Sequence, residues 1–303
     1  MNELPSGDHI VRVLAKEAGV LAMACSARSV VQEAARRHAA SPVATAALGY
    51  GLSAAALMGS LLKVQQSVAI KVEGNGPLEK MVVESDSYGR LRGYVANPEW
   101  SVVGPVGAAE VAAGMGGLGL LTVVKDLGVK NLYEGVVPLQ TGELDKDLMY
   151  YLMQSEQILS LLELGAELDP DGRIAAAGGF LLQAVPGHDT AILEQLVERT
   201  EDLPPIERML AEGDTPAGVL REIFGDVSYE ILETRPITFR CTCSRERSLQ
   251  ALRLLDREDL LTLIAEGEAV IDCHFCHERY VFDRSVVEDV LSALEAQQGV
   301  AKD

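Results

Sequence analysis

The chain has 303 residues, of which 48% are hydrophobic and 23% charged, so it can bury a substantial core and divide into two domains or more. Lysine and arginine total 26 against 45 acidic residues, and the net charge of -19 disfavours nucleic acid or an anionic membrane surface as a partner. The N-terminal residues show no basic stretch followed by an apolar run, so we expect no signal peptide and a reducing, cytoplasmic location for the cysteines.

The N-terminal part of the chain predicts a mixed sheet with helices packed against it. Strands are expected, from their composition and turn signals, over residues 9–15, 20–27, 67–96 (three strands with turns at 74–77 and 88–89), 120–126 and 172–187. Helices are expected, from the spacing of apolar residues, over residues 29–38, 42–62 and 145–165. Together these elements predict an α+β domain that ends near Gly187.

One apolar segment, Ala39 to Leu62, carries no charge and is long enough to cross a bilayer. Its residues are mainly alanine, glycine and serine, which gain little from hydrocarbon compared with leucine, isoleucine and phenylalanine. Small residues also let a helix pack closely against a sheet. We therefore predict a buried core helix and no membrane partner.

Two motifs look like parts of enzyme sites but lack the required surroundings. The glycines from Gly114 to Gly119 fit the dinucleotide fingerprint, yet a strand-like run follows them where cofactor binding needs a helix. Ser155 and Glu156 lie side by side on a predicted helix, and no histidine lies nearby in the sequence. We therefore predict a glycine-rich turn and helix packing or capping, and we predict that the protein is not an enzyme.

Residues 188–236 differ in composition from the domain before them. From His188 to Arg240 there are 12 acidic residues against 5 arginines, a net charge of -7, with short amphipathic helical patterns. Such short helices are stable only when they dock onto another part of the protein. The pattern alone fits an ordinary helical connector as well as a marginally stable linker. Its apolar positions include Ile192, Leu196, Val219 and Phe224.

Four of the five cysteines form two close pairs. The first pair is Cys241 and Cys243, the second pair is Cys273 and Cys276, and 29 residues with a helical pattern lie between the pairs. Two such pairs can place four thiolates around one tetrahedral Zn²⁺ ion, each pair supplying two corners. The sequence therefore predicts a small C-terminal domain with a four-cysteine zinc site and one Zn²⁺ per chain.

The remaining candidate ligands are less suited to this site. His274 and His277 could bind zinc, but four cysteines already complete a structural site. Cys25 lies in an apolar strand and is predicted to be a buried core thiol. Residues 237–290 offer only a minimal core, so the metal would supply much of the folding free energy, on the order of 10 kcal/mol.

The spacing of the first pair also bears on redox chemistry. In extended backbone its Cα atoms lie about 6.5 to 7 Å apart, at the edge of disulfide geometry, so a disulfide there is strained and readily reduced. Zinc keeps the four sulfurs as thiolates, which react with oxidants. Oxidation would close the pairs, expel the metal and unfold the domain. This arrangement suits a switch, and an inert structural site is the alternative.

These residues resemble the heat shock protein 33 family of redox-regulated holdase chaperones. The resemblance rests on "ITFRCTCSRERSLQALRLLDREDL" together with "CHFCHERYVFD". It extends upstream through "YLMQSEQ", "AGGFLLQAVPG" and "GNGPL", and so covers essentially the whole chain. One departure is His274, which stands where the family usually has an acidic residue. That departure concerns the oxidant sensitivity of this chain, not its zinc binding.

The resemblance implies an ATP-independent chaperone that is reduced, zinc-loaded and inactive at rest. When active it would be oxidised, partly unfolded and dimeric, with disulfides from Cys241 to Cys243 and from Cys273 to Cys276. Unfolding client proteins would bind apolar positions of the linker, Ile192, Leu196, Val219 and Phe224 among them.

The implied organisation has four parts: a core domain (1–187), a helical linker (188–236), a zinc-binding redox-switch domain (237–293) and a flexible tail (294–303). Two alternatives from other classes are a structural zinc-ribbon adaptor, which would keep its fold after oxidation, and a thiol-disulfide oxidoreductase, which would turn over a small disulfide. The oxidoreductase expects C-x-x-C at the start of a helix within a βαβ unit, whereas here the pairs flank a helical insert.

Overall fold

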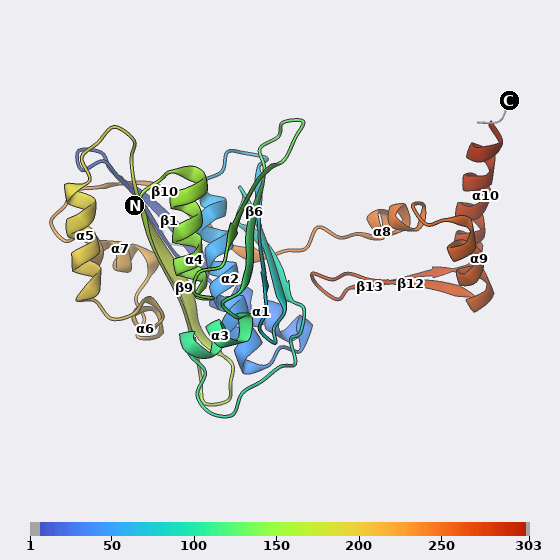
Figure 1. Ribbon diagram of the computed structural model, residues 1–303, viewed down its shortest axis with the longest axis horizontal. Helices are drawn as coiled ribbons and strands as arrows, with labels where there is room; N and C mark the ends of the chain where they lie inside the picture. The colour runs from blue at the N-terminus through green and yellow to red at the C-terminus, as the bar shows by residue number, and fades with distance from the viewer. Residues whose placement is uncertain (1–6, 301–303) are drawn as a thin grey trace. The chain divides into compact units, whose positions relative to one another are not determined.

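The computed structural model describes residues 7–300, with side chains up to residue 296 (Figure 1). Contacts divide the chain into two units, Met1–Arg240 and Cys241–Asp303. Helices and strands alternate irregularly along the chain, and the strands form antiparallel sheets apart from one short parallel pairing, which confirms the predicted α+β class.

The first unit contains a five-stranded antiparallel sheet with the strand order β10-β1-β2-β9-β8. Its strands are β10 (Glu230–Pro236), β1 (His9–Ala15), β2 (Val20–Ser26), β9 (Ile174–Ala184) and β8 (Ser160–Leu168). Both faces of the sheet are buried at β1, β2 and β9, because alternate residues along these strands belong to two different hydrophobic clusters. In β2, for example, Ala22 and Ala24 belong to one cluster while Met23 and Cys25 belong to the other.

A second sheet of six strands follows the order β11-β5-β4-β3-β6-β7. Its strands are β11 (Thr238–Phe239), β5 (Arg90–Val95), β4 (Lys80–Asp86), β3 (Ser67–Gly74), β6 (Gly119–Asp126) and β7 (Tyr133–Pro138). Burial alternates strictly along β3, β4 and β5, so one face of each strand packs on the core. The predicted meander over residues 67–96 is therefore confirmed.

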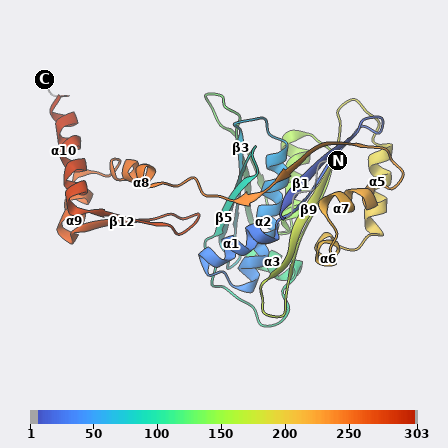
Figure 2. The ribbon, with the colours of Figure 1, turned by 180° about the vertical axis from the view of Figure 1, so that it is seen from behind.

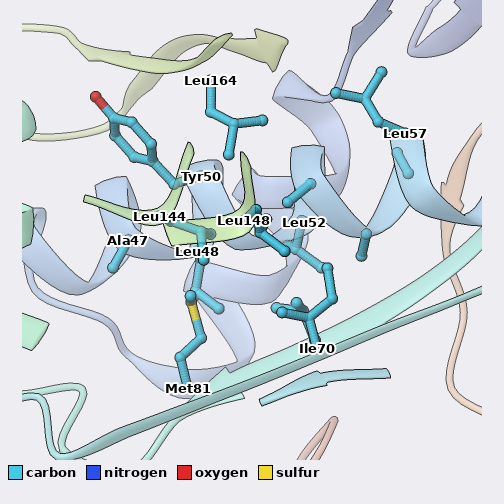
Figure 3. Packing of buried hydrophobic residues seen from close by; sticks show 14 of the residues in the cluster. Ala47, Leu48, Tyr50, Leu52, Leu57, Ile70, Met81, Leu144, Leu148 and Leu164 are labelled. Carbon is cyan, nitrogen blue, oxygen red and sulfur yellow. The ribbon is translucent and has the colours of Figure 1, made fainter. Parts of the chain in front are cut away.

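Helix α2 (Pro42–Ser60) lies between the two sheets and packs on both (Figure 3). Ser41 caps its N-terminus by accepting a hydrogen bond from the Ala44 amide, and Pro42 occupies the first turn. Every residue from Val43 to Ser60 is buried. At Gly51 an added Cβ would lie 2.6 Å from the Met81 sulfur and 2.9 Å from Cγ1 of Val83, so glycine allows the helix to approach the sheet closely there.

This helix is the apolar segment that the sequence analysis singled out. By length and composition it could span a membrane, but its whole apolar window is buried inside the protein. The prediction of a buried core helix is confirmed. Around α2 lie α1 (Arg28–His38), α3 (Ala108–Met115) and α4 (Leu144–Tyr151), which continues into the π-helical turn η1 (Leu152–Glu156).

Three short helices cover the opposite face of the five-stranded sheet: α5 (Ala191–Glu201), α6 (Ile206–Ala211) and α7 (Pro216–Phe224). Figure 2 shows them on one side of β1 and β9, with α2 on the other side. The apolar side chains of these helices join those of β1, β2 and β9 in one hydrophobic cluster. After α7 the chain adds β10 to the edge of the first sheet and β11 to the edge of the second.

The helix predicted over residues 145–165 is wrong in its second half. The helix stops at Gln157, which takes a left-handed conformation with a φ of 57°. Residues from Ser160 onward form β8 and pair with β9. The leucines of this strand also fit helical spacing, so only the non-local pairing with β9 decides between the two structures.

The second unit is small. It contains α8 (Arg245–Leu252), α9 (Arg257–Glu266), the hairpin of β12 (Glu268–Asp272) and β13 (Arg279–Asp283), and α10 (Arg284–Val300). Within the described residues its buried hydrophobic cluster has six members: Leu252, Leu260, Ala269, Phe282, Val287 and Val290. The predicted minimal core is therefore confirmed. Residues 294–300, expected in a flexible tail, belong to α10, and the rest of that expected tail lies outside the described residues.

Candidate metal centre

The two cysteine pairs lie in loops of the second unit. The first pair lies in the segment that leads into α8, and the second pair lies in the turn between β12 and β13. The sulfurs of Cys241 and Cys273 are 3.7 Å apart, and those of Cys243 and Cys276 are 3.3 Å apart. All four sulfurs lie within 4.8 Å of one another. Residues separated by a long helical insert in the sequence thus converge on one point.

Local structure fixes both loops. Ser244 caps α8 by accepting a hydrogen bond from the Arg247 amide, so the helix begins directly after Cys243. The second pair is held by the hairpin, since the Cys273 amide donates to the Glu278 carbonyl and the His277 amide donates to the Cys273 carbonyl. His277 takes a left-handed conformation, with a φ of 55°, at the point where the turn reverses.

The four sulfurs fit a zinc ion. A regular tetrahedron with Zn–S bonds of about 2.3 Å has sulfurs about 3.8 Å apart, close to the separations found here. Burial raises the pKa of Cys273 and of Cys276, so four thiolates at this place require a cation among them. Among the described residues, the side chains close enough together to share a metal ion are the four cysteines, and neither His274 nor His277 is one of them. The four cysteines therefore could hold a metal ion, with zinc the ion that this donor set suits.

A tyrosine next to the centre escaped the sequence analysis. Tyr280, on β13, donates its hydroxyl hydrogen bond to the sulfur of Cys243 at 3.2 Å. Such a contact stabilises the thiolate form of the sulfur and orients it. The only sequence signal was the aromatic residue four positions after Cys276, and no spacing rule connects that position with the first pair.

The fifth cysteine belongs to the first unit and is not part of this centre. Cys25 is fully buried in β2, where its thiol contacts the Ser53 carbonyl at 3.8 Å. Burial raises the pKa of Cys25 to about 12, so the group stays a neutral thiol at physiological pH. The prediction of a buried core thiol is confirmed.

The predicted client-binding residues are covered in this structure. Leu196 of α5 and Val219 and Phe224 of α7 are buried against the first sheet, and Ile192 is partly buried in the same cluster. Their assignment to clients stays a prediction, because these side chains become available only if α5–α7 leave the sheet.

One polar contact that anchors these helices had no counterpart in the sequence analysis. The carboxylate of Glu163, on β8, accepts a hydrogen bond from the Ile206 amide at 2.8 Å and so caps α6 from another element. The two residues are 43 positions apart, so local sequence patterns could not reveal the contact.

The two motifs set aside in the sequence analysis have structural roles. The glycines from Gly114 to Gly119 connect α3 to β6, with no strand before them and no helix after them. Glu156 accepts a hydrogen bond from the Tyr151 hydroxyl and forms an ion pair with Lys125. The prediction of a turn is confirmed for the glycines, and the prediction of helix packing or capping for Ser155 and Glu156 stays a prediction.

Fold and site together define a class: an α+β protein whose small second unit carries a four-cysteine centre able to hold a metal. A sequence model of the family described as "Hsp33 protein" matches residues 8–283. The 33 kDa chaperonin of Geobacter sp. (strain M21) is 42% identical over 292 residues, which cover 96% of this chain and 99% of that protein. The 33 kDa chaperonin of Geobacillus kaustophilus (strain HTA426) is 42% identical over 286 residues, which cover 94% of this chain and 97% of that protein.

A solved structure agrees with these sequence matches. The crystal structure of the 33 kDa chaperonin (heat shock protein 33 homolog) from Thermotoga maritima matches with a TM-score of 0.87 and 35% identity, over 95% of this chain and 98% of that one. The chain therefore belongs to the Hsp33 protein family, as its sequence resemblance suggested, and its function is that of a chaperone.

Proposed function

We propose that this chain is a redox-regulated, ATP-independent holdase that binds unfolding proteins under oxidative stress in the cytoplasm. The observation that carries the proposal is the convergence of four thiols in a unit whose buried hydrophobic cluster, among the described residues, has only six members. A core of this size cannot stabilise a unit without a further contribution. A Zn²⁺ ion bound by the four sulfurs would supply that contribution, on the order of 10 kcal/mol.

Oxidation removes the ligands on which this stability depends. In each pair, two thiolates give two electrons to one molecule of hydrogen peroxide, which takes up two protons and leaves as two water molecules while one S–S bond forms. The expected disulfides are Cys241 to Cys243 and Cys273 to Cys276, as the family resemblance implies. With all four sulfurs lying close together, distance alone does not select this pairing. Tyr280 loses its thiolate acceptor in the same step.

Unfolding of the second unit is then expected to destabilise the helices that precede it. Residues 188–240 carry a net charge of -7, and their helices have only 6 to 11 residues, so they depend on docking to the sheet. Their release would uncover Leu196, Val219 and Phe224 together with the face of the sheet that these residues now bury. A continuous apolar surface of this kind can hold an unfolding protein and can join two copies of the chain into a dimer.

The test compares the zinc-loaded, reduced protein with protein treated with peroxide under mild heating. The proposal predicts loss of one zinc per chain, two disulfides, dimerisation, and suppression of client aggregation without ATP. Cys25→Ser is the matched control and is expected to behave like the unsubstituted protein. If the oxidised protein keeps its fold and shows no holdase activity, the zinc-ribbon adaptor is correct. If it turns over a small disulfide substrate catalytically, the oxidoreductase is correct.

A further inference from the structure

A cavity lies where α5 joins α6, inside the first unit. Its volume is about 290 Å³. One side of it is formed by Leu203, Pro205 and Glu207 from the segment of α5–α7, and the other side by residues of α2, α3, α4 and β8. The cavity is far smaller than a protein-binding groove, and its volume suits a ligand with few heavy atoms.

Tyr50 of α2 contributes a hydroxyl group to the cavity. The residue is only 7% exposed and lines the cavity. Within the part of the chain that the structure describes, its hydroxyl makes no hydrogen bond to a protein group. Figure 3 shows the ring beside Leu164, with the oxygen directed away from Leu52 and Leu148. The hydroxyl therefore faces the cavity and is available as a hydrogen-bond partner for a bound group.

Four carboxylates surround this hydroxyl: Glu143, Asp145, Glu163 and Glu207 all line the cavity. Burial and the neighbouring carboxylates raise the pKa of Glu163 and of Asp145, and burial also raises that of Glu207. An added Cβ on Gly165 would lie 2.0 Å from Oε2 of Glu207, so that carboxylate is packed directly over the strand.

No cation offsets this charge from inside the cavity among the described residues. Lys146 forms an ion pair with Glu143 at 2.6 Å but is exposed, and Arg208 is exposed and pairs with Glu212. Neither basic residue lines the cavity, and Glu167 on β8 adds further negative charge nearby. The site therefore combines negative potential, one free hydroxyl and apolar walls that include Leu144 and Leu164.

We infer that this cavity binds a small aliphatic ammonium ion, such as a diamine with four or five carbons. The ammonium group pairs with the carboxylates and donates one hydrogen bond to the Tyr50 hydroxyl, while the alkyl chain contacts the leucines. A bare divalent cation would use the carboxylates but gain nothing from the apolar walls. A neutral or anionic ligand of the same size would leave the carboxylates uncompensated.

Binding has a consequence for the linker, and this consequence rests on the proposed function. The ligand would contact Leu203, Pro205 and Glu207 on one side and the sheet and α2 on the other. It would therefore bind only the state in which α6 is docked and would stabilise that state by mass action. A diamine would raise the amount of oxidant needed to activate the chaperone.

The experiment is isothermal titration calorimetry of the full-length, reduced, zinc-loaded protein with 1,4-diaminobutane at low ionic strength. Butane-1,4-diol serves as the neutral ligand of similar length, and Mg²⁺ as the inorganic cation. Since no oxidant is present, binding succeeds or fails independently of the redox switch. We expect saturable 1:1 binding of the diamine, no binding of the diol, and weaker diamine binding as the pH falls and the carboxylates take up protons.

Three variants assign the binding to this cavity. Tyr50→Phe removes one hydrogen bond and is expected to weaken the diamine about 2- to 10-fold. Glu207→Gln removes one charge without changing shape and is expected to weaken it by about tenfold or more. Glu212→Gln removes a charge directly after α6 but outside the cavity. It is the matched control and should leave the affinity for the diamine unchanged. Thermal melts verify that each variant is folded.

Several outcomes would overturn the inference. They are no saturable binding of the diamine, equal binding of the diol, equal weakening in Glu212→Gln, or unchanged affinity in both Tyr50→Phe and Glu207→Gln. The inference would also be overturned if Mg²⁺ bound tightly, excluded the diamine and kept its affinity in Tyr50→Phe. The cavity would then be a site for an inorganic cation.

Discussion

Replacement of Phe224 by alanine is expected to activate the chaperone without oxidation. The ring is fully buried in α7, and its centroid lies 4.8 Å from that of Tyr229. It belongs to the hydrophobic cluster that joins α5–α7 to β1, β2 and β9. Truncation of a buried phenylalanine to alanine costs about 3 to 5 kcal/mol. The substitution destabilises the docked state relative to the undocked state by this amount, because the ring leaves the cluster when α7 undocks.

A loss of that size raises the undocked population by roughly a factor of 100 or more. The assay is hydrogen exchange of amides in residues 216–224, measured together with suppression of client aggregation, in reduced protein with its zinc verified. Glu222→Ala changes an exposed residue of the same helix and should alter neither quantity. If Phe224→Ala lost protection over α7 and still failed to bind clients, the surface beneath α5–α7 would not be the client site. Unchanged protection would refute the energetic reasoning itself.

Three further predictions concern the metal and the carboxylates. Cys273→Ser should lose its zinc while Cys25→Ser keeps it, as metal analysis will show; the opposite result contradicts the ligand assignment. Under mild oxidation the second pair should form its disulfide before the first, because its two-residue spacing is less strained, and mass-spectrometric trapping of the first disulfide alone would reverse this order. Burial raises the pKa of Glu207 above its ordinary 4.5, so docking of α6 should be most stable below that pH and weaken as the pH rises through the raised pKa. Hydrogen exchange of α6 as a function of pH measures this. Glu207→Gln should reduce the slope of the profile, and Glu163, whose pKa burial also raises, should contribute the rest; an unchanged slope in the variant contradicts the assignment to Glu207.

The features that the sequence predicted well are those encoded locally. Cys241 and Cys243, or Cys273 and Cys276, are near neighbours in the chain, so each half of the centre forms within one loop and only one long-range approach is required. Helix α2 was predictable because a long uncharged segment rich in small apolar residues is usually buried in the interior of a protein.

The features that escaped prediction depend on partners distant in the chain. β8 was taken for helix because its leucines fit both periods and β9 alone supplies the pairing. The cap that Glu163 gives to α6 and the contact of Tyr280 with Cys243 each join segments that are distant in the chain, and no local pattern reveals them. The domain boundaries at 187, 236 and 293 stay predictions, because contacts place residues 188–240 with the first unit and do not reveal which segments detach on oxidation.

Hydrogen exchange compared between the reduced zinc form and the fully oxidised form tests the central claim most directly. The structure and the proposed switch predict that residues 241–290 lose protection on oxidation, that α5–α7 lose protection with them, and that the two sheets and α2 keep theirs. Protection that survived throughout residues 188–290 while holdase activity appeared would contradict the unfolding switch and require activation by assembly alone.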